Sequence, residues 1–125
     1  MARKKSQTLT EAELPIMEVL WHKGTATVGD VMEGLSKDRP VAYNTVLTLM
    51  RILERKGYVQ HTKDGRAFVY KPVVDRGEAS RTAVRQLLNR FFNNSPELLM
   101  LNLLRDETID DREIERLRAL TDKER

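Results

Sequence analysis

The chain has 125 residues, of which 40% are hydrophobic and 33% charged, and it contains no cysteine. This length suits one domain, or a small domain with an appendage. The lack of cysteine excludes disulfides and thiolate metal sites and favours a cytoplasmic location. No apolar run reaches the roughly 18 residues that a membrane-spanning helix needs. No apolar segment follows the basic start either, so we predict neither membrane insertion nor a signal peptide.

Positive charge is concentrated in the N-terminal part of the chain. Residues 1–71 hold 12 Lys and Arg against 8 Asp and Glu, a balance of +4, whereas residues 72–125 hold 10 and 11, a balance of −1. This asymmetry favours an anionic partner for the N-terminal part alone.

Three helices are predicted first, over residues 10–24, 27–37 and 42–56. The first two begin with a threonine that is followed three residues later by an acidic residue, which is the pattern of a capping box. A glycine directly follows the apolar periodicity of the first and third helices, where it tolerates the left-handed conformation that ends a helix.

A β-hairpin is predicted over residues 58–72, because the apolar period there changes from helical to two. Asp64-Gly65 lies near its centre and is a typical hairpin-turn dipeptide. Pro72 closes the second arm.

Three further helices are predicted over residues 75–92, 95–107 and 110–120. Ser95 and Pro96 are residues that favour the first positions of a helix, so they mark the start of the middle one. No internal repeat or low-complexity segment is present.

The helix over residues 42–56 has two different faces when it is placed on a wheel at about 100° per residue. An apolar face covers an arc of roughly 100° and consists of Val46, Leu49, Met50 and Leu53. A polar stripe of roughly 60° lies opposite and consists of Asn44, Thr48, Arg51 and Arg55. These polar side chains can donate hydrogen bonds to base edges and phosphates, and none is acidic. Taken alone, such a stripe is more typical of a solvated helix face.

The surroundings of this helix favour DNA binding. Two short helices precede it, and a hairpin with Lys63 and Arg66 near its tip follows it. Three helices followed by a two-stranded ribbon are typical of winged helix-turn-helix proteins, whose second motif helix enters the major groove. In that arrangement the two wing cations reach backbone phosphates or the minor groove. The alternative for the wing alone is a surface hairpin kept soluble by its charges.

We therefore expect the DNA-contacting residues to come from this helix and the wing. They are Ala42, Tyr43, Asn44, Thr45, Leu47, Thr48, Arg51, Arg55, Lys63 and Arg66. Thr45 is expected nearer the edge of the core, where it would contact a phosphate close to the helix N-terminus. Leu47 is expected to be exposed beside Arg51, where it could meet a thymine methyl group.

Three stretches, "LTEAELPIMEVLW", "AYNTVLTLMRILERKGYV" and "DGRAFVYKP", carry a resemblance to a known family. Over residues 9–120 the sequence resembles the penicillinase-repressor family, the BlaI/MecI-type winged-helix transcriptional repressors. The resemblance implies a homodimer that binds a dyad-symmetric operator and blocks transcription, with a link to β-lactamase regulation. It places Thr45 and Thr48 on recognition-helix positions. Leu47 stands where some staphylococcal-type members carry a basic residue.

Residues 74–125 carry more apolar surface than three short helices of one chain can bury. Pairing with a second copy would cover that surface and set two recognition helices roughly 34–36 Å apart, about one turn of DNA. The expected dimer contacts are Val84, Leu87, Leu88, Phe91, Leu98, Leu101, Leu104 and Leu117. A monomeric helical appendage is the alternative.

These observations predict a mainly α fold with a small β-hairpin wing. We expect a winged helix-turn-helix DNA-binding domain over residues 1–73 and a helical dimerisation domain over residues 74–125. The predicted partners are a double-stranded DNA operator and a second copy of the chain.

Asn102 interrupts an apolar run, either as a buried polar group that fixes the packing register or as an exposed one. In the repressors that the sequence resembles, a sensor-linked metalloprotease pathway inactivates the protein by cutting after an Asn in the matching segment, typically at Asn-Phe. Here the pair is Asn102-Leu103. A cut there would separate the dimerisation helices from one another.

An enzyme is not predicted. His22 and His61 are the only histidines, and neither has a second ligand at metal-binding spacing. No glycine-rich phosphate loop or catalytic triad pattern is present. We therefore expect no catalytic residue, no metal and no cofactor. The alternatives to a repressor are a ligand-responsive winged-helix regulator and a winged-helix protein-interaction module that does not bind DNA.

Overall fold

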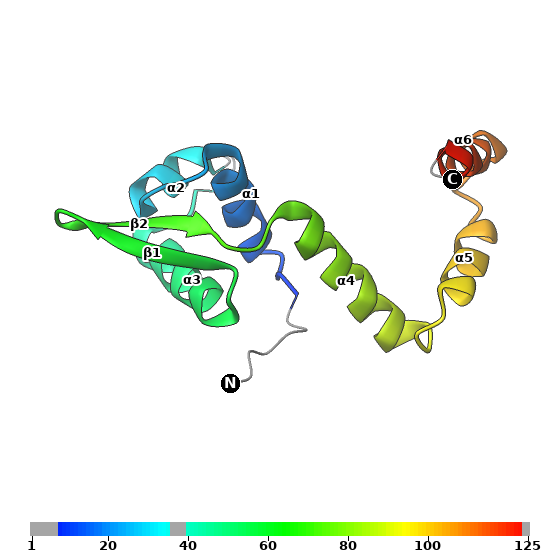
Figure 1. Ribbon diagram of the computed structural model, residues 1–125, viewed down its shortest axis with the longest axis horizontal. Helices are drawn as coiled ribbons and strands as arrows, with labels where there is room; N and C mark the ends of the chain where they lie inside the picture. Colours follow the sequence, from blue (N-terminus) through cyan, green and yellow to red (C-terminus); the bar gives the residue numbers. More distant parts are fainter. Residues whose placement is uncertain (1–7, 36–39, 124–125) are drawn as a thin grey trace. The chain divides into compact units, whose positions relative to one another are not determined.

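A computed structural model of the protein describes residues 8–35 and 40–123 (Figure 1). In this part of the chain the elements are α1 (Glu13–Lys23), α2 (Val28–Gly34), α3 (Tyr43–Lys56), β1 (Val59–Asp64), β2 (Ala67–Pro72), α4 (Arg76–Phe91), α5 (Pro96–Leu104) and α6 (Asp111–Lys123). The predicted order and the mainly α class with one hairpin are confirmed. The end of the helix expected over residues 27–37 lies outside the described residues. No helix among those described is long and apolar enough to cross a membrane.

The chain forms two compact units, Met1–Val84 and Arg85–Arg125. The first unit therefore includes the first turns of α4 and reaches beyond the domain boundary expected at residue 73. Ala79 on α4 is buried in the core of this unit, which accounts for the extension.

Capping boxes begin α1 and α2, as their sequences predict. The backbone N–H of Thr10 donates to Glu13 Oε1 at 2.9 Å, and the N–H of Glu13 donates to Thr10 Oγ1 at 3.2 Å. Thr27 and Asp30 make the same reciprocal pair, with both distances at 3.1 Å. The hydrogen bond from the Thr27 backbone lowers the pKa of the Asp30 carboxyl group, because it favours the ionised form. Both helix starts are therefore set by local sequence.

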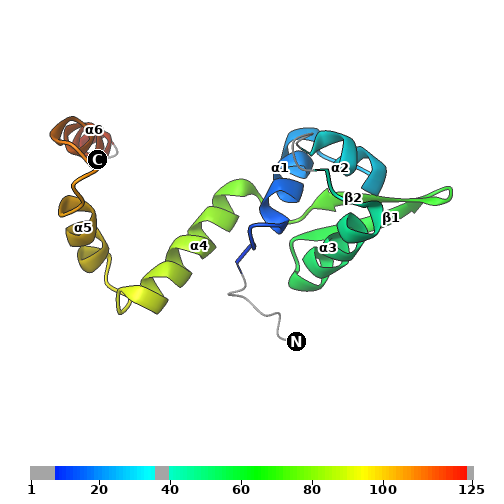
Figure 2. The same cartoon turned by 180° about the vertical axis from the view of Figure 1, so that it is seen from behind.

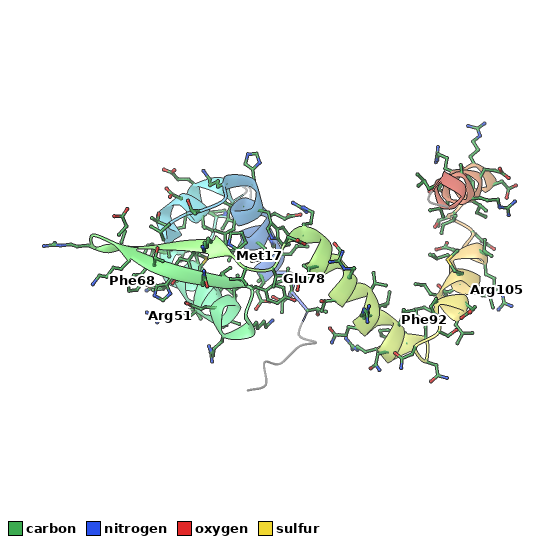
Figure 3. The ribbon with its side chains drawn as sticks, viewed as in Figure 1. Met17, Arg51, Phe68, Glu78, Phe92 and Arg105 are labelled. Atoms are coloured by element: carbon green, nitrogen blue, oxygen red, sulfur yellow. The ribbon has the colours of Figure 1, made fainter. Side chains whose placement is uncertain are left out.

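The core of the first unit lies between α1, α2, α3 and the hairpin. α3 contacts α1, α2 and β1, while β2 contacts α1 and α2. The fully buried side chains are Ile16, Met17, Leu20, Val31, Val46, Met50, Leu53 and Tyr70; Met17 is labelled in Figure 3. This cluster fixes α3 on its apolar side and leaves the opposite side uncovered.

The hairpin turn lies one residue later than its sequence predicts. The strands are antiparallel, and Asp64 pairs with Ala67, so Gly65 and Arg66 are the two central residues of the turn. Gly65 has a φ of 65°, whereas the φ of Arg66 is not positive. A positive φ at the first central residue alone matches a type II′ turn, in which glycine takes that position. Arg66 is thus part of the wing tip itself. The hairpin extends past the three helices in both views (Figures 1 and 2).

The start of α4 is tied to α1. The indole N–H of Trp21 donates to the carbonyl oxygen of Val74 at 2.9 Å. The guanidinium of Arg76 lies 4.8 Å from the centroid of the Trp21 ring and 3.4 Å from a carboxylate oxygen of Glu18. These contacts explain why the first unit continues into α4.

The second unit contains short helices with well-defined starts and little interior. Asn93 and Asn94 both have positive φ and form the turn after α4. Ser95 caps α5 through the N–H of Leu98, and Pro96 is the first residue of the helix; these predictions are confirmed. None of the residues of α5 is buried, so its apolar side chains are not enclosed within the single chain.

Candidate nucleic-acid interface

The polar stripe of α3 lies on its uncovered side. Asn44, Thr48, Arg51 and Arg55 are all exposed, while Val46, Met50 and Leu53 are fully buried. The hydrogen-bonded helix and its packed face hold the stripe in one orientation. The predicted separation of a core face from a polar face is therefore confirmed.

Two residues of α3 lie differently from the sequence expectation. Leu47 was expected to be exposed, but it is half-buried and packs against the core. The reason is its place at the border of the apolar arc, where one side of the side chain packs on the core and the other lines a groove. Thr45, which was expected at the core edge, is exposed.

A groove of about 510 Å³ runs between α3, the start of α2 and the wing. It is lined by Thr27, Val28, Gly29, Tyr43, Leu47, Arg51, Arg66, Ala67 and Phe68. Arg51 and Phe68, labelled in Figure 3, belong to α3 and the wing respectively. The groove thus combines two guanidinium groups with two exposed aromatic rings, those of Tyr43 and Phe68.

The groove brings together four of the predicted DNA-contacting residues: Tyr43, Leu47, Arg51 and Arg66. The other six are exposed outside it. Ala42 is the N-cap of α3, and Lys63 lies on β1, paired with Phe68. Asn44, Thr45, Thr48 and Arg55 belong to α3 itself.

Sequence reasoning missed the part of this groove that comes from α2 and β2. Phe68 was read only as part of an alternating strand, and residues 27–29 only as a helix start. The usable signal for Phe68 was the hairpin register, because the residues beside the turn determine which side chains share a face. A turn at Asp64-Gly65 also leaves Phe68 on the face of His61 and Lys63, so this signal was present in the sequence.

The cations of the interface have no carboxylate partner in the described part of the chain. The ion pairs there join Lys56 to Glu13, His61 to Glu54 and Arg76 to Glu18. Arg51, Arg55, Lys63 and Arg66 are in none of them. Four exposed cations without a carboxylate partner, on α3 and the hairpin, suit an anionic partner such as a phosphate backbone.

In the described ranges, no group of three or more His, Asp or Glu side chains is placed to hold a metal ion. His61 has a carboxylate neighbour in Glu54, but that is a single pair.

The predicted dimer residues are largely exposed in the single chain. Leu88 is half-buried, and the exposed ones are Val84, Leu87, Phe91, Leu98, Leu101, Leu104 and Leu117. Asn102 is exposed and Leu103 half-buried, and both lie within α5. Of the two readings of Asn102, the exposed one is therefore correct for the single chain.

Comparison with known proteins places this architecture in a family. A model of the family described as Penicillinase repressor matches residues 9–123. A penicillinase repressor of Bacillus licheniformis is 32% identical over 114 residues, which cover 91% of this chain and 89% of that protein.

Two solved structures match about three fifths of the chain. The DNA-binding domain of the repressor BlaI has 34% identity and a TM-score of 0.53, with 62% of this chain and 93% of that one covered. The monomeric form of Bacillus licheniformis BlaI in complex with the blaP half-operator has 34% identity and a TM-score of 0.50, with 59% and 90% covered. The fold of the first unit is therefore a winged helix-turn-helix, and the chain belongs to the penicillinase repressor family.

Proposed function

We propose that the chain is a transcriptional repressor that binds a double-stranded DNA operator and carries out no chemical reaction itself. The observation that carries this proposal is the exposed face on which Arg51, Arg55, Lys63 and Arg66 have no carboxylate partner in the described chain. The relatives support it, since one is named a penicillinase repressor and another structure holds BlaI on a half-operator.

In this proposal α3 enters the major groove, which is about 12 Å wide and admits one helix. Arg51 lies near the middle of the stripe and is our candidate for a bidentate contact to guanine. Arg66 at the wing tip and Lys63 on β1 contact phosphates beside the groove. The exposed N–H groups at the start of α3, next to Ala42 and Tyr43, suit a phosphate.

Replacing Arg51 with alanine is expected to weaken binding to a selected operator by about 1–3 kcal/mol, which is roughly 5- to 150-fold. The probe is a duplex of about 30 base pairs, three helical turns, selected from a random library by the unmodified chain. Fluorescence anisotropy gives the affinity. Arg105→Ala is the matched control, since Arg105 is exposed in the second unit and lies outside the interface.

The same titration at several salt concentrations separates DNA binding from association through an apolar surface. Affinity for DNA falls steeply as salt rises, because bound counterions are released. An Arg51→Ala variant that binds as tightly as the unmodified chain would show that Arg51 does not read bases. A salt-independent affinity would argue against DNA as the partner.

We further propose that the repressor is a homodimer, with DNA binding assigned to residues 1–73 and dimerisation to residues 74–125. The support is the uncovered apolar surface of the second unit. α5 has no buried residue, and a cavity of about 280 Å³ between α5 and α6 has apolar walls that include Met100, Leu104 and Ile114. A helix that is apolar nearly all round is stable only when it is enclosed.

Proteolysis between Asn102 and Leu103 is our proposal for inactivation, through a sensor-linked metalloprotease. The bond lies inside α5, and Asn102 is exposed. Because α5 buries none of its residues, local opening of this helix should be easy. In induced cells an immunoblot should show a fragment that ends at residue 102, and Asn102→Ala should remain intact. An unmodified chain that stays whole after induction would contradict this proposal.

A further inference from the structure

A carboxylate on α3 and an imidazole on the wing are directly joined. His61 Nδ1 lies 2.8 Å from both carboxylate oxygens of Glu54. An ionised carboxylate can only accept hydrogen bonds, so Nδ1 must carry the proton that is donated. Glu54 is in the last turns of α3 and His61 is in the middle of β1. The pair thus connects the helix that carries the polar stripe to the first strand of the wing.

The imidazole also contacts two aromatic rings of the opposite strand. Its centroid lies 4.7 Å from that of Phe68 and 5.4 Å from that of Tyr70, with the rings tilted by 40° and 44°. Tyr70 is the cross-strand partner of His61 and is buried in the core. His61 is therefore held from β2 on one side and from Glu54 on α3 on another.

Phe68 carries this connection to the surface. It is exposed and lines the groove together with Arg51 and Arg66. A continuous series of contacts therefore runs from Glu54 to His61 and on to Phe68. If the imidazole shifted, the adjacent ring of Phe68 could shift with it.

We propose that Glu54 and His61 are positioning residues that hold the wing against α3. They thereby place Phe68 at the edge of the protein groove that lies between α2, α3 and the wing. This inference rests on the proposed function, because it concerns how well the wing and α3 fit one duplex together. Neither residue needs to touch DNA. Their effect should appear in the preference for the operator over random DNA, since non-specific binding depends chiefly on charge.

Other charged and titratable groups face the same region. Arg51 and Tyr43 come from α3, Tyr70 comes from β2, and Lys63 is two residues from His61 on the same face of β1. Burial raises the pKa of the Tyr70 hydroxyl group, Glu54 adds to this effect, and Arg51 opposes it. Tyr70 therefore stays neutral at neutral pH and adds no charge beside the pair.

The size of the effect follows from the exposure of the pair. The side chains of His61 and Glu54 are 35% and 33% exposed, so water screens their attraction. Breaking it should lower the ratio of operator affinity to random-duplex affinity by about two- to fivefold.

The experiment uses the full chain, the selected operator duplex and a random duplex of equal length, titrated by anisotropy. Three variants break the pair in different ways: Glu54→Ala, His61→Phe and the double variant. Phe at position 61 keeps a ring against Phe68 but lacks Nδ1. His61→Gln keeps an N–H donor but lacks the ring. Gln60→Ala, at the exposed neighbouring position of β1, and Glu11→Ala, which removes an exposed carboxylate just before α1, are the matched controls.

We expect each single variant to lower the affinity ratio, and the double variant to lower it no more than the single variants do, because they share one interaction. His61→Gln keeps the donor but loses the ring, so it should retain more of the ratio than His61→Phe, whereas a role of ring packing alone would give the reverse order. Circular dichroism melting checks that each variant is folded. Additive losses, or a lower ratio in His61→Gln than in His61→Phe, would overturn the inference and leave the proposed function intact. If the unmodified chain selected no duplex at all, both would fail.

Discussion

Replacing Glu13 with alanine is expected to lower the free energy of unfolding by about 3 kcal/mol. Lys56 Nζ lies 2.7 Å from Glu13 Oε1, and the two side chains are only 14% and 3% exposed. Lys56 also donates to the carbonyl oxygen of Thr8 at 3.2 Å. Removing Glu13 leaves a largely buried ammonium group without its counter-charge, and this desolvation cost makes the effect large. Urea denaturation followed by circular dichroism measures it.

Glu11→Ala is the matched control for this prediction. Glu11 lies just before the same helix but is exposed, so its loss should change stability by no more than about 0.5 kcal/mol. A second comparison separates the charge from the packing. The double variant Glu13→Leu with Lys56→Met has no unpaired buried charge and should be more stable than Glu13→Ala. Equal stability of Glu11→Ala and Glu13→Ala would refute a structural role for the pair.

The same pair shows what sequence reasoning could and could not reach. Glu13 was correctly assigned to a capping box with Thr10, because that partner is three residues away and follows a local rule. Lys56 is 43 residues away, and no spacing rule predicts which helix end meets which. The helix starts at Thr27 and Ser95 and the helix end at Gly57 were predictable for the same local reason.

In the candidate interface, too, features within one element were predictable from sequence and contacts between distant elements were not. The polar stripe of α3 was predictable because a single helix has a fixed period, and its exposed members lie where the wheel placed them. The groove was not predictable from sequence, because it forms only where α2, α3 and the wing meet in the folded chain. Glu54 had no role in the sequence-based prediction, and His61 was considered only as a metal ligand. Each gained a role when folding brought α3 to β1.

The other large effect concerns the proposed dimer, for which we expect Leu87→Asp to produce a monomer. Leu87 is 40% exposed in the single chain and belongs to the apolar stripe of α4 with Val84 and Phe91. If a second copy covers this stripe, an aspartate there would be buried without a counter-charge, which is costly. Sedimentation velocity at micromolar concentration should show the 14.5 kDa chain alone for the variant, and twice that mass for the unmodified protein.

Loss of the dimer should weaken operator binding by about 10²- to 10⁴-fold, because the second half-site is then no longer bound within one molecule. Asn89→Asp is the matched control. It adds the same charge two residues later on the same helix, about 200° around from Leu87, at an exposed position. It should stay dimeric and keep its operator affinity. Affinity for a single half-site should be alike in both variants, because α3 and the wing are unchanged. A Leu87→Asp protein that still sediments as a dimer would show that this face of α4 is not the interface, and an unmodified chain that sediments as a monomer would refute the homodimer itself.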